Sequence, residues 1–434
     1  DARSLEPLHD GSRWNRRVVR HISDAMAGLA QASDGLCGTG DRSAPPPDHA
    51  VEIESNRWEG RVCAGGRGHA DASIAPRRDG PEDWHGHDMQ IGVMSFGDAG
   101  PDVANNGGPA GAMQNLLELI TLADEVGLDV FGVGEHHRPD FPVSVPAVVL
   151  AAAAARTSQI RLTSSVTVLG SDDPVRVFQQ FATVDQISNG RAEIIAGRGS
   201  FIESFPLFGY ALDDYEALFE EKLELLLTLR ENERVTWSGR MRAPLEDRGV
   251  YPRPVQSRIP ISIAVGGTPE SVARAGRLGL PLVLAIIGGS PHRFAPLAEL
   301  YRSVGEQAGH DPAGLSMGLS AIGFVGDSQE EAIATFSPPY ARVMTQLGRE
   351  RGWGPVSAAQ VEHSMGPSSA LIVGDAPEVT EKLLALNEMF GLDRFILQPD
   401  IGGLPHDRVM RAIELLGTEV APAVRAAGPV SPAG

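Results

Sequence analysis

The chain has 434 residues, 42% of them apolar, and exceeds the ~250 residues of a typical single (β/α)8 barrel. Its formal net charge of −19 opposes binding to phosphodiester backbones, and no apolar run reaches the ~20 residues of a membrane-spanning helix. The two cysteines, Cys37 and Cys63, can build neither a disulfide scaffold nor a CxxC metal site. We therefore expect no nucleic-acid partner, no membrane association and a reducing, cytoplasmic location.

Residues 1–88 differ in composition from the rest of the chain. They carry scattered Arg, Gly, Pro, Asp and His without sustained apolar alternation, and the first twenty contain no apolar segment typical of a secretory signal. Met89 directly precedes the first convincing strand. This pattern predicts a poorly ordered, dispensable N-terminal extension, with a regulatory or partner-binding arm as the alternative.

From residue 89 onward, apolar runs alternate with segments of helical periodicity, which predicts βαβ units and a parallel sheet. The predicted strands are residues 90–96, 129–133, 160–168, 192–196, 259–265, 282–286, 316–325 and 394–398. The predicted helices are residues 112–126, 145–157, 174–188, 213–230, 270–278, 293–308, 329–347, 376–390 and 407–416. Eight strands, mostly each followed by a helix, favour a (β/α)8 TIM barrel at residues 89–425, with a tail at 426–434, over a doubly wound sheet.

The second strand ends in a cluster of ionisable groups, GEHHR at residues 134–138. In TIM barrels the reacting groups lie at the carboxyl ends of the strands. An imidazole whose tautomer is fixed by a carboxylate is suited to proton transfer, so Glu135, His136 and His137 are the predicted catalytic residues. A solvated loop or a pair of metal ligands is the alternative.

The fourth strand ends in AGRGS, residues 196–200. Glycines on both sides let a ligand approach the backbone, while Arg198 offers a planar fork to a phosphate. Arg191 begins the same strand and therefore faces the structural end of the barrel, where we expect a surface ion pair.

The fifth strand runs directly into a helix through the segment VGGTPES, residues 265–271. Free backbone N–H groups at a helix start, with hydroxyls nearby, suit a phosphate monoester. The predicted anion ligands are Gly266, Gly267, Thr268 and Ser271. A plain helix start, with Thr268 as the cap and Pro269 at the first helical position, is the alternative that needs no ligand.

The third strand carries small hydroxyl side chains where a barrel core usually holds bulky branched ones. Its sequence from residue 162 to residue 168 is LTSSVTV. Small residues there leave room for a flat ligand across the barrel mouth, although a tolerated polar face explains them equally well.

Together these segments resemble the luciferase-like flavin monooxygenases. The resemblance covers residues 89–425 and is most specific at residues 134–137, 174–191, 197–200 and 263–281. It implies reduced flavin mononucleotide (FMN) bound at the barrel mouth, which reacts with oxygen to give a flavin peroxide that oxidises an organic substrate.

The resemblance also implies roles for single residues. His136 matches the catalytic histidine of the active-site cavity, with Glu135 and His137 beside it. Arg198 matches the arginine that meets the flavin phosphate. The phosphate cradle is implied at the backbone and hydroxyls of Gly266, Gly267, Thr268 and Ser271.

The comparison with the family also covers the third predicted strand and two positions at which this sequence differs from luciferases. The bond between Ser165 and Val166 matches a non-proline cis peptide beneath the flavin ring, a bond that costs roughly 3 to 4 kcal/mol elsewhere. Gly267 stands where luciferases carry an acidic residue. The strand end at residues 286–289 lacks the aromatic side chain of luciferase itself, so we do not expect light emission.

The function predicted from the sequence is a monooxygenase that receives reduced FMN from a separate NAD(P)H:flavin reductase and acts as a homodimer. A coenzyme F420-dependent oxidoreductase and a non-catalytic flavin-binding or light-emission accessory protein are alternatives. A metal hydrolase using His136, His137 and Asp140 is disfavoured because no other strand end offers an evident His ligand. The substrate is not predicted, but segments 97–111 and 201–215 should shape its pocket.

Overall fold

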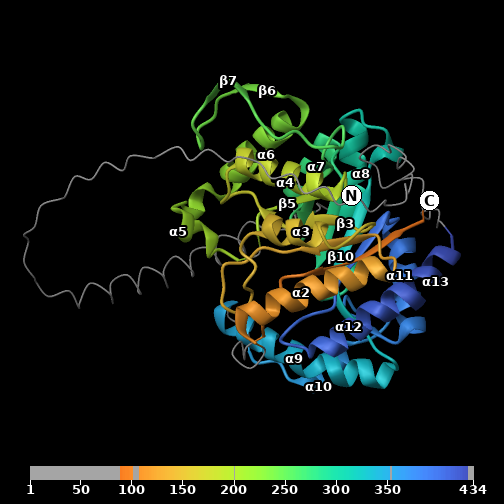
Figure 1. Cartoon of the computed structure of the whole chain (residues 1–434). Coiled ribbons are helices and arrows are strands. Elements are labelled where there is room, and N and C mark those ends of the chain that lie inside the picture. The colour runs from red at the N-terminus through yellow and green to blue at the C-terminus, as the bar shows by residue number, and fades with distance from the viewer. Residues whose placement is uncertain (1–87, 101–106, 200, 352–353, 429–434) are drawn as a thin grey trace, which may run out of the picture. The chain divides into compact units, whose positions relative to one another are not determined.

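The computed structural model describes residues 88–100, 107–199, 201–351 and 354–428. The predicted extension, apart from Asp88, and the end of the predicted tail lie outside these residues. Eight parallel strands close into a ring in the order β1 (Gln90–Ser95), β2 (Val130–Val133), β3 (Arg161–Ser164), β5 (Ala192–Gly197), β8 (Ile261–Val265), β9 (Leu282–Ile286), β10 (Met317–Val325) and β12 (Arg394–Gln398). Figure 1 labels β3, β5 and β10 among them. Since β12 pairs again with β1, the predicted (β/α)8 barrel is confirmed.

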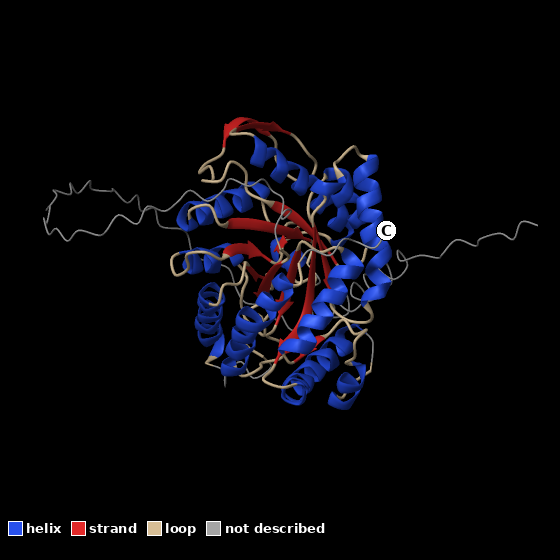
Figure 2. Ribbon diagram, turned by 90° about the vertical axis from the view of Figure 1, so that its right-hand side faces the viewer, coloured by secondary structure: helices blue, strands red, loops and turns tan. Residues whose placement is uncertain are grey.

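Helices surround the strands on the outside (Figure 2). The principal ones are α2 (Gly108–Glu125), α3 (Pro146–Ala154), α4 (Pro174–Ser188), α6 (Tyr215–Glu231), α7 (Pro269–Leu278), α8 (Ala295–Gln307), α9 (Gln329–Arg351), α11 (Ala376–Phe390), α12 (His406–Leu415) and α13 (Ala421–Ala426). Pro174 and Pro269 lie in the first turns of their helices, as predicted. Asp173 caps α4 by accepting the backbone N–H of Val175 at 2.9 Å. Within the described ranges, no helix is both long and apolar enough to cross a bilayer.

Several elements differ from the prediction. The third predicted strand is divided into β3 and β4 (Thr167–Val168), both parallel to β5. Elements that were not predicted are α5 (Ser204–Phe208), the hairpin of β6 (Arg234–Trp237) and β7 (Leu245–Gly249), α10 (Ala358–Ser364) and β11 (Ile372–Gly374). These are short and mostly lie in the long connections after β5 and β10, where few residues carry a periodic signal.

Alternation along the strands separates two apolar cores. An inner cluster joins residues of five strands inside the barrel, namely Met94, Val130, Ile195, Val283 and Ile396. Their sequence neighbours, such as Val93 and Phe131, belong to the larger cluster between strands and helices. Toward the amino ends of the strands, Glu193 and Arg394 follow the inward alternation and form a buried ion pair, with 2.6 Å between Oε2 and Nη1.

The position of Arg191 differs from the predicted surface ion pair. It is buried rather than part of a surface ion pair. Its guanidinium donates to the backbone oxygens of Ala154, Thr157 and Ile160, at 3.1, 2.9 and 2.7 Å. Carbonyl groups at the end of a helix have no partner within the helix, so an arginine beneath α3 can satisfy several at once. The residue therefore fastens α3 to the start of β5.

Candidate active site

Small residues line the inside of the barrel at the carboxyl ends of the strands. A Cβ atom added to Gly132 would lie 2.7 Å from the Cβ of Ser165, and one added to Gly197 would lie 2.6 Å from Val166. These two glycines therefore let the segment between β3 and β4 run close against both neighbouring strands. The peptide bond between Ser165 and Val166 is cis, which confirms that prediction.

His136 lies at this end of the barrel, on the inward side of the chain that leaves β2. Strand alternation places it in line with Val130 and Gly132, and its side chain is buried. Three phenyl rings surround the imidazole, with ring centroids 4.5 Å away for Phe96, 5.1 Å for Phe141 and 4.7 Å for Phe201. The three rings come from different connecting segments of the barrel, so no local pattern predicts that they gather around His136.

Glu203 is the carboxylate that faces His136. Its Oε1 lies 3.4 Å from His136 Nδ1. Although burial opposes the charged carboxylate, the hydrogen bond from His136 holds the pKa of Glu203 below its usual value. An acceptor at Nδ1 places the proton there and leaves Nε2 as the working nitrogen. Sequence reasoning missed Glu203 because it lies in the loop after β5, where no pattern marks it.

Glu135 and His137 form a second pair with different contacts. His137 Nε2 lies 3.2 Å from Glu135 Oε1, and the other carboxylate oxygen accepts the backbone N–H of Val168 at 2.9 Å. The hydrogen bond to Glu135 raises the pKa of His137 above its usual value. The three predicted catalytic residues are thus divided, since alternation sends His136 to one side and its two neighbours to the other.

The start of α7 presents the predicted anion ligands. Gly267 has a φ of 118°, a backbone conformation that strongly favours glycine. Thr268 occupies the N-cap position, yet its side chain makes no cap hydrogen bond. The Ser271 side chain is only 3% exposed, and its Oγ has no hydrogen-bond partner among the described residues. A plain capped helix start would leave this buried hydroxyl unexplained.

Arg198 lies on the same side of the barrel as the start of α7. Its strand, β5, pairs directly with β8, which leads into that helix. The guanidinium packs over the ring of Tyr215, 5.0 Å from the centroid, and pairs with the Glu216 carboxylate. Burial lowers the pKa of Arg198. The geometry therefore brings a cation and the hydroxyl of Ser271 toward one region, as a phosphate site requires.

A family model described as luciferase-like monooxygenase matches residues 89–394. The chain belongs to this family. N-acetyl-S-alkylcysteine monooxygenase of Bacillus subtilis is 28% identical over 307 residues, which span 66% of this chain and 87% of the relative.

Solved structures show the same fold. The oxygenating constituent of 3,6-diketocamphane monooxygenase from Pseudomonas putida, in complex with FMN, has a TM-score of 0.61 and 19% identity, covering 77% of this chain and 98% of its own. Coenzyme F420 dependent tetrahydromethanopterin reductase of Methanopyrus kandleri has a TM-score of 0.60 and 18% identity, covering 77% and 99%. Luciferase-like folds with either cofactor are therefore similar to this one.

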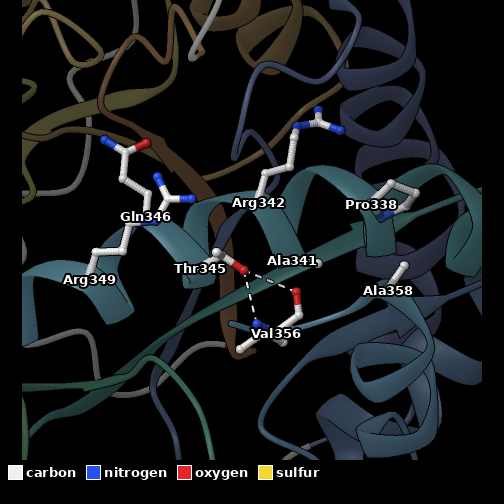
Figure 3. A pocket seen from close by; sticks show the side chains of 8 residues that line it. All are labelled: Pro338, Ala341, Arg342, Thr345, Gln346, Arg349, Val356 and Ala358. Carbon is white, nitrogen blue, oxygen red and sulfur yellow. Dashed lines mark hydrogen bonds between the residues drawn. The ribbon is translucent and has the colours of Figure 1, made fainter. Parts of the chain in front are cut away.

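A separate groove runs along one face of α9 (Figure 3). Its volume is about 680 Å³, and its lining residues are Pro338, Ala341, Arg342, Thr345, Gln346, Arg349, Val356 and Ala358. Thr345 Oγ1 bonds both backbone groups of Val356 there, at 2.9 and 3.0 Å. None of the predicted site residues of this luciferase-like monooxygenase lines the groove, so its candidate active site is defined by the strand ends instead.

The histidine cluster does not form a metal centre in the described part of the chain. No group of three or more His, Cys, Asp or Glu side chains is arranged to hold a metal ion in those ranges. Asp140, the third ligand of the metal-hydrolase alternative, pairs with Arg138 at 3.3 Å instead. The contacts of Asp140 therefore give no support to the metal-hydrolase alternative.

Proposed function

We propose that this protein is a flavin-dependent monooxygenase that uses reduced FMN and O2 on a small organic substrate. The observation that most directly supports this proposal is the buried Ser271 hydroxyl at the start of α7, which has no partner among the described residues. It lies on the side of the barrel where Arg198 also lies. A buried hydroxyl without a partner costs free energy that a phosphate ligand would recover. The similarity to an FMN-bound monooxygenase of the same fold supports this choice.

The residues present fit such a cofactor. Arg198, with the backbone and hydroxyls of the α7 start at Gly266, Gly267, Thr268 and Ser271, would hold the phosphate. Ser165 and Val166 would lie beneath the ring system, where the adjacent glycines allow close approach. When bound, the reduced flavin supplies the electrons that activate O2. We assign its reduction to a separate NAD(P)H:flavin reductase.

His136 is assigned the proton-transfer role. Glu203 holds the proton at Nδ1, which leaves Nε2 to accept or donate a proton at the substrate or cofactor. The phenyl rings of Phe96, Phe141 and Phe201 exclude water from the imidazole. This apolar surrounding keeps bulk water from competing with the substrate or cofactor for the proton.

An oxidoreductase dependent on coenzyme F420 is the second candidate, because a solved F420-dependent reductase shares the fold. Titrating the purified protein with FMN and with F420, followed by measurement of oxygen consumption, separates the two. Tighter F420 binding without oxygen uptake would replace the first proposal. Flavin binding without turnover on any member of a broad substrate panel would instead support a non-catalytic flavin-binding protein.

Replacing Arg198 with alanine is expected to weaken FMN binding by about tenfold or more, because a charge-assisted contact to the phosphate is lost. Quenching of flavin fluorescence on titration measures the affinity. Arg240→Ala, at an exposed position before β7, is the matched control and should bind FMN as the parent does. Unchanged affinity in Arg198→Ala would remove this residue from the phosphate site.

We also propose that the protein is a homodimer joined through α3 and α4, two helices that pack side by side. Val148 on α3 and Ile187 on α4 are 67% and 47% exposed, and exposed apolar side chains on two adjacent helices would be covered in such a dimer. Light scattering should give twice the chain mass, and Val148→Asp should shift it to that of a monomer. Leu207→Asp, an equally exposed apolar site on α5, should stay dimeric. A monomeric parent protein would contradict this proposal.

A further inference from the structure

Two guanidinium groups meet one carboxylate between α6 and α7, the two helices beside the anion ligands. Glu216 pairs with Arg198 through Oε1 and with Arg274 through Oε2, the latter at 3.4 Å. Arg274 also contacts the Glu220 carboxylate at 2.5 Å. We call Arg198 and Arg274 the arginine pair. Its members come from different elements, the end of β5 and the middle of α7, yet they share one acidic partner.

Burial differs sharply across this cluster. The side chains of the arginine pair are 15% and 10% exposed, whereas that of Glu216 is 54% exposed. Aromatic rings lie beneath both guanidiniums, Tyr215 at 5.0 Å and Phe219 at 5.6 Å from the ring centroid. The cations are therefore held in place, while the carboxylate is half in solvent and can leave at little cost.

Two buried donors near the pair lack partners among the described residues. They are the Oγ atom of Ser271 and the Nη1 atom of Arg274. Ser271 and Arg274 stand three residues apart on α7, so both side chains project from the same face of the helix. A guanidinium has five N–H donors and no acceptor, and a buried donor left unpaired is costly. One acceptor group that satisfies both donors would therefore need several oxygen atoms.

We propose that Arg274 is a second ligand of the phosphate monoester that Arg198 contacts, and that Glu216 competes with this phosphate for the arginine pair. This inference rests on the proposed function, because the phosphate is that of FMN. A phosphate monoester carries close to two negative charges at neutral pH and three acceptor oxygens. It can therefore serve both guanidiniums and the Ser271 hydroxyl, while a single carboxylate serves only part of this set.

The competition has a defined consequence for affinity. Binding of the phosphate displaces Glu216 from two cations and leaves its negative charge beside a dianion, so this carboxylate weakens FMN binding. Replacing Glu216 with the neutral amide glutamine would remove both the competition for the arginine pair and the repulsion of the phosphate. Arg274 has the opposite effect on affinity, and neither residue should influence a flavin that lacks the phosphate.

Titrations of the full-length protein with FMN and with riboflavin test this inference, because riboflavin lacks the phosphate. Arg274→Gln should weaken FMN binding by roughly tenfold or more and leave riboflavin binding unchanged. Arg277→Gln, the same change at an exposed position one turn later on α7, should alter neither. Glu216→Gln should tighten FMN binding several-fold, an effect that misfolding cannot produce.

Three results would overturn the inference. FMN affinity in Arg274→Gln equal to that in Arg277→Gln would remove Arg274 from the site. Weaker FMN binding in Glu216→Gln would make that carboxylate a supporting group rather than a competitor. If the unaltered protein bound neither FMN nor riboflavin, the proposed function itself would fail, whereas FMN binding insensitive to both variants would refute this inference alone.

Discussion

Replacing His136 with asparagine is expected to lower kcat by about 10²- to 10⁴-fold while FMN affinity changes little. Asparagine keeps a polar group of similar reach but cannot accept or release a proton near neutral pH. The imidazole lies among three phenyl rings and its Nδ1 faces Glu203, so an asparagine here would leave these apolar surroundings without the proposed proton-transfer group. Steady-state kinetics with a reductase-coupled supply of reduced FMN, combined with flavin titration, would measure both quantities.

The adjacent histidine supplies the matched comparison. His137→Asn makes the same substitution one residue along, where the ring pairs with Glu135 and does not face the three phenyl rings around His136. Its loss of kcat should therefore be the smaller of the two. Glu203→Gln should also lower kcat, because a neutral amide replaces the carboxylate that pairs with the His136 ring. Equal losses in both histidine variants, or a parent-like kcat in His136→Asn, would refute the assignment.

The barrel could be predicted from sequence because its signals are local. Apolar runs of strand length, prolines at helix starts and Gly267 before α7 each act within a few residues. Ligand-binding residues of parallel barrels gather at the carboxyl ends of strands, so the positions of His136 and Arg198 followed from the strand assignments. The division of His136 from Glu135 and His137 was not predicted, although alternation with a period of two continues past the end of β2.

Features that depend on packing between distant segments could not be predicted. Glu203 meets His136 although the two residues are 67 positions apart in the chain, and Glu216 meets Arg274 although they are 58 positions apart. Arg191 was misassigned because its position at the amino end of a strand suggested solvent. The end of α3 lies above it, with carbonyl groups that need donors. A charged residue at the start of a strand can thus be assigned to the surface or to the interior only when the helix that covers it is known.

The ion pair inside the barrel leads to the largest expected effect on stability. Glu193→Gln should lower the free energy of unfolding by about 3 to 5 kcal/mol, the usual cost of removing one partner from a buried pair. Arg394 is 0% exposed and donates to both oxygens of Glu193, at 2.6 and 3.2 Å, and Arg161 pairs with the same carboxylate. An amide fills the same volume but removes the negative charge that lies between the guanidiniums of Arg161 and Arg394. Urea denaturation would measure the loss.

Glu414→Gln is the control, because Glu414 pairs with Arg411 at the surface, where the two side chains are 48% and 41% exposed, and such a pair should contribute at most about 1 kcal/mol. The effect of pH provides an independent test. Burial opposes the charged form of Glu193, yet the two arginines lower its pKa from 4.5 to about 2. A lowered acid pKa stabilises the fold above pH 4.5, and this contribution is lost as the pH falls through 2. Glu193→Gln should therefore reduce the loss of unfolding free energy at acid pH. If both the acid part of this pH dependence and the urea midpoint were unchanged, the pair would not stabilise the barrel.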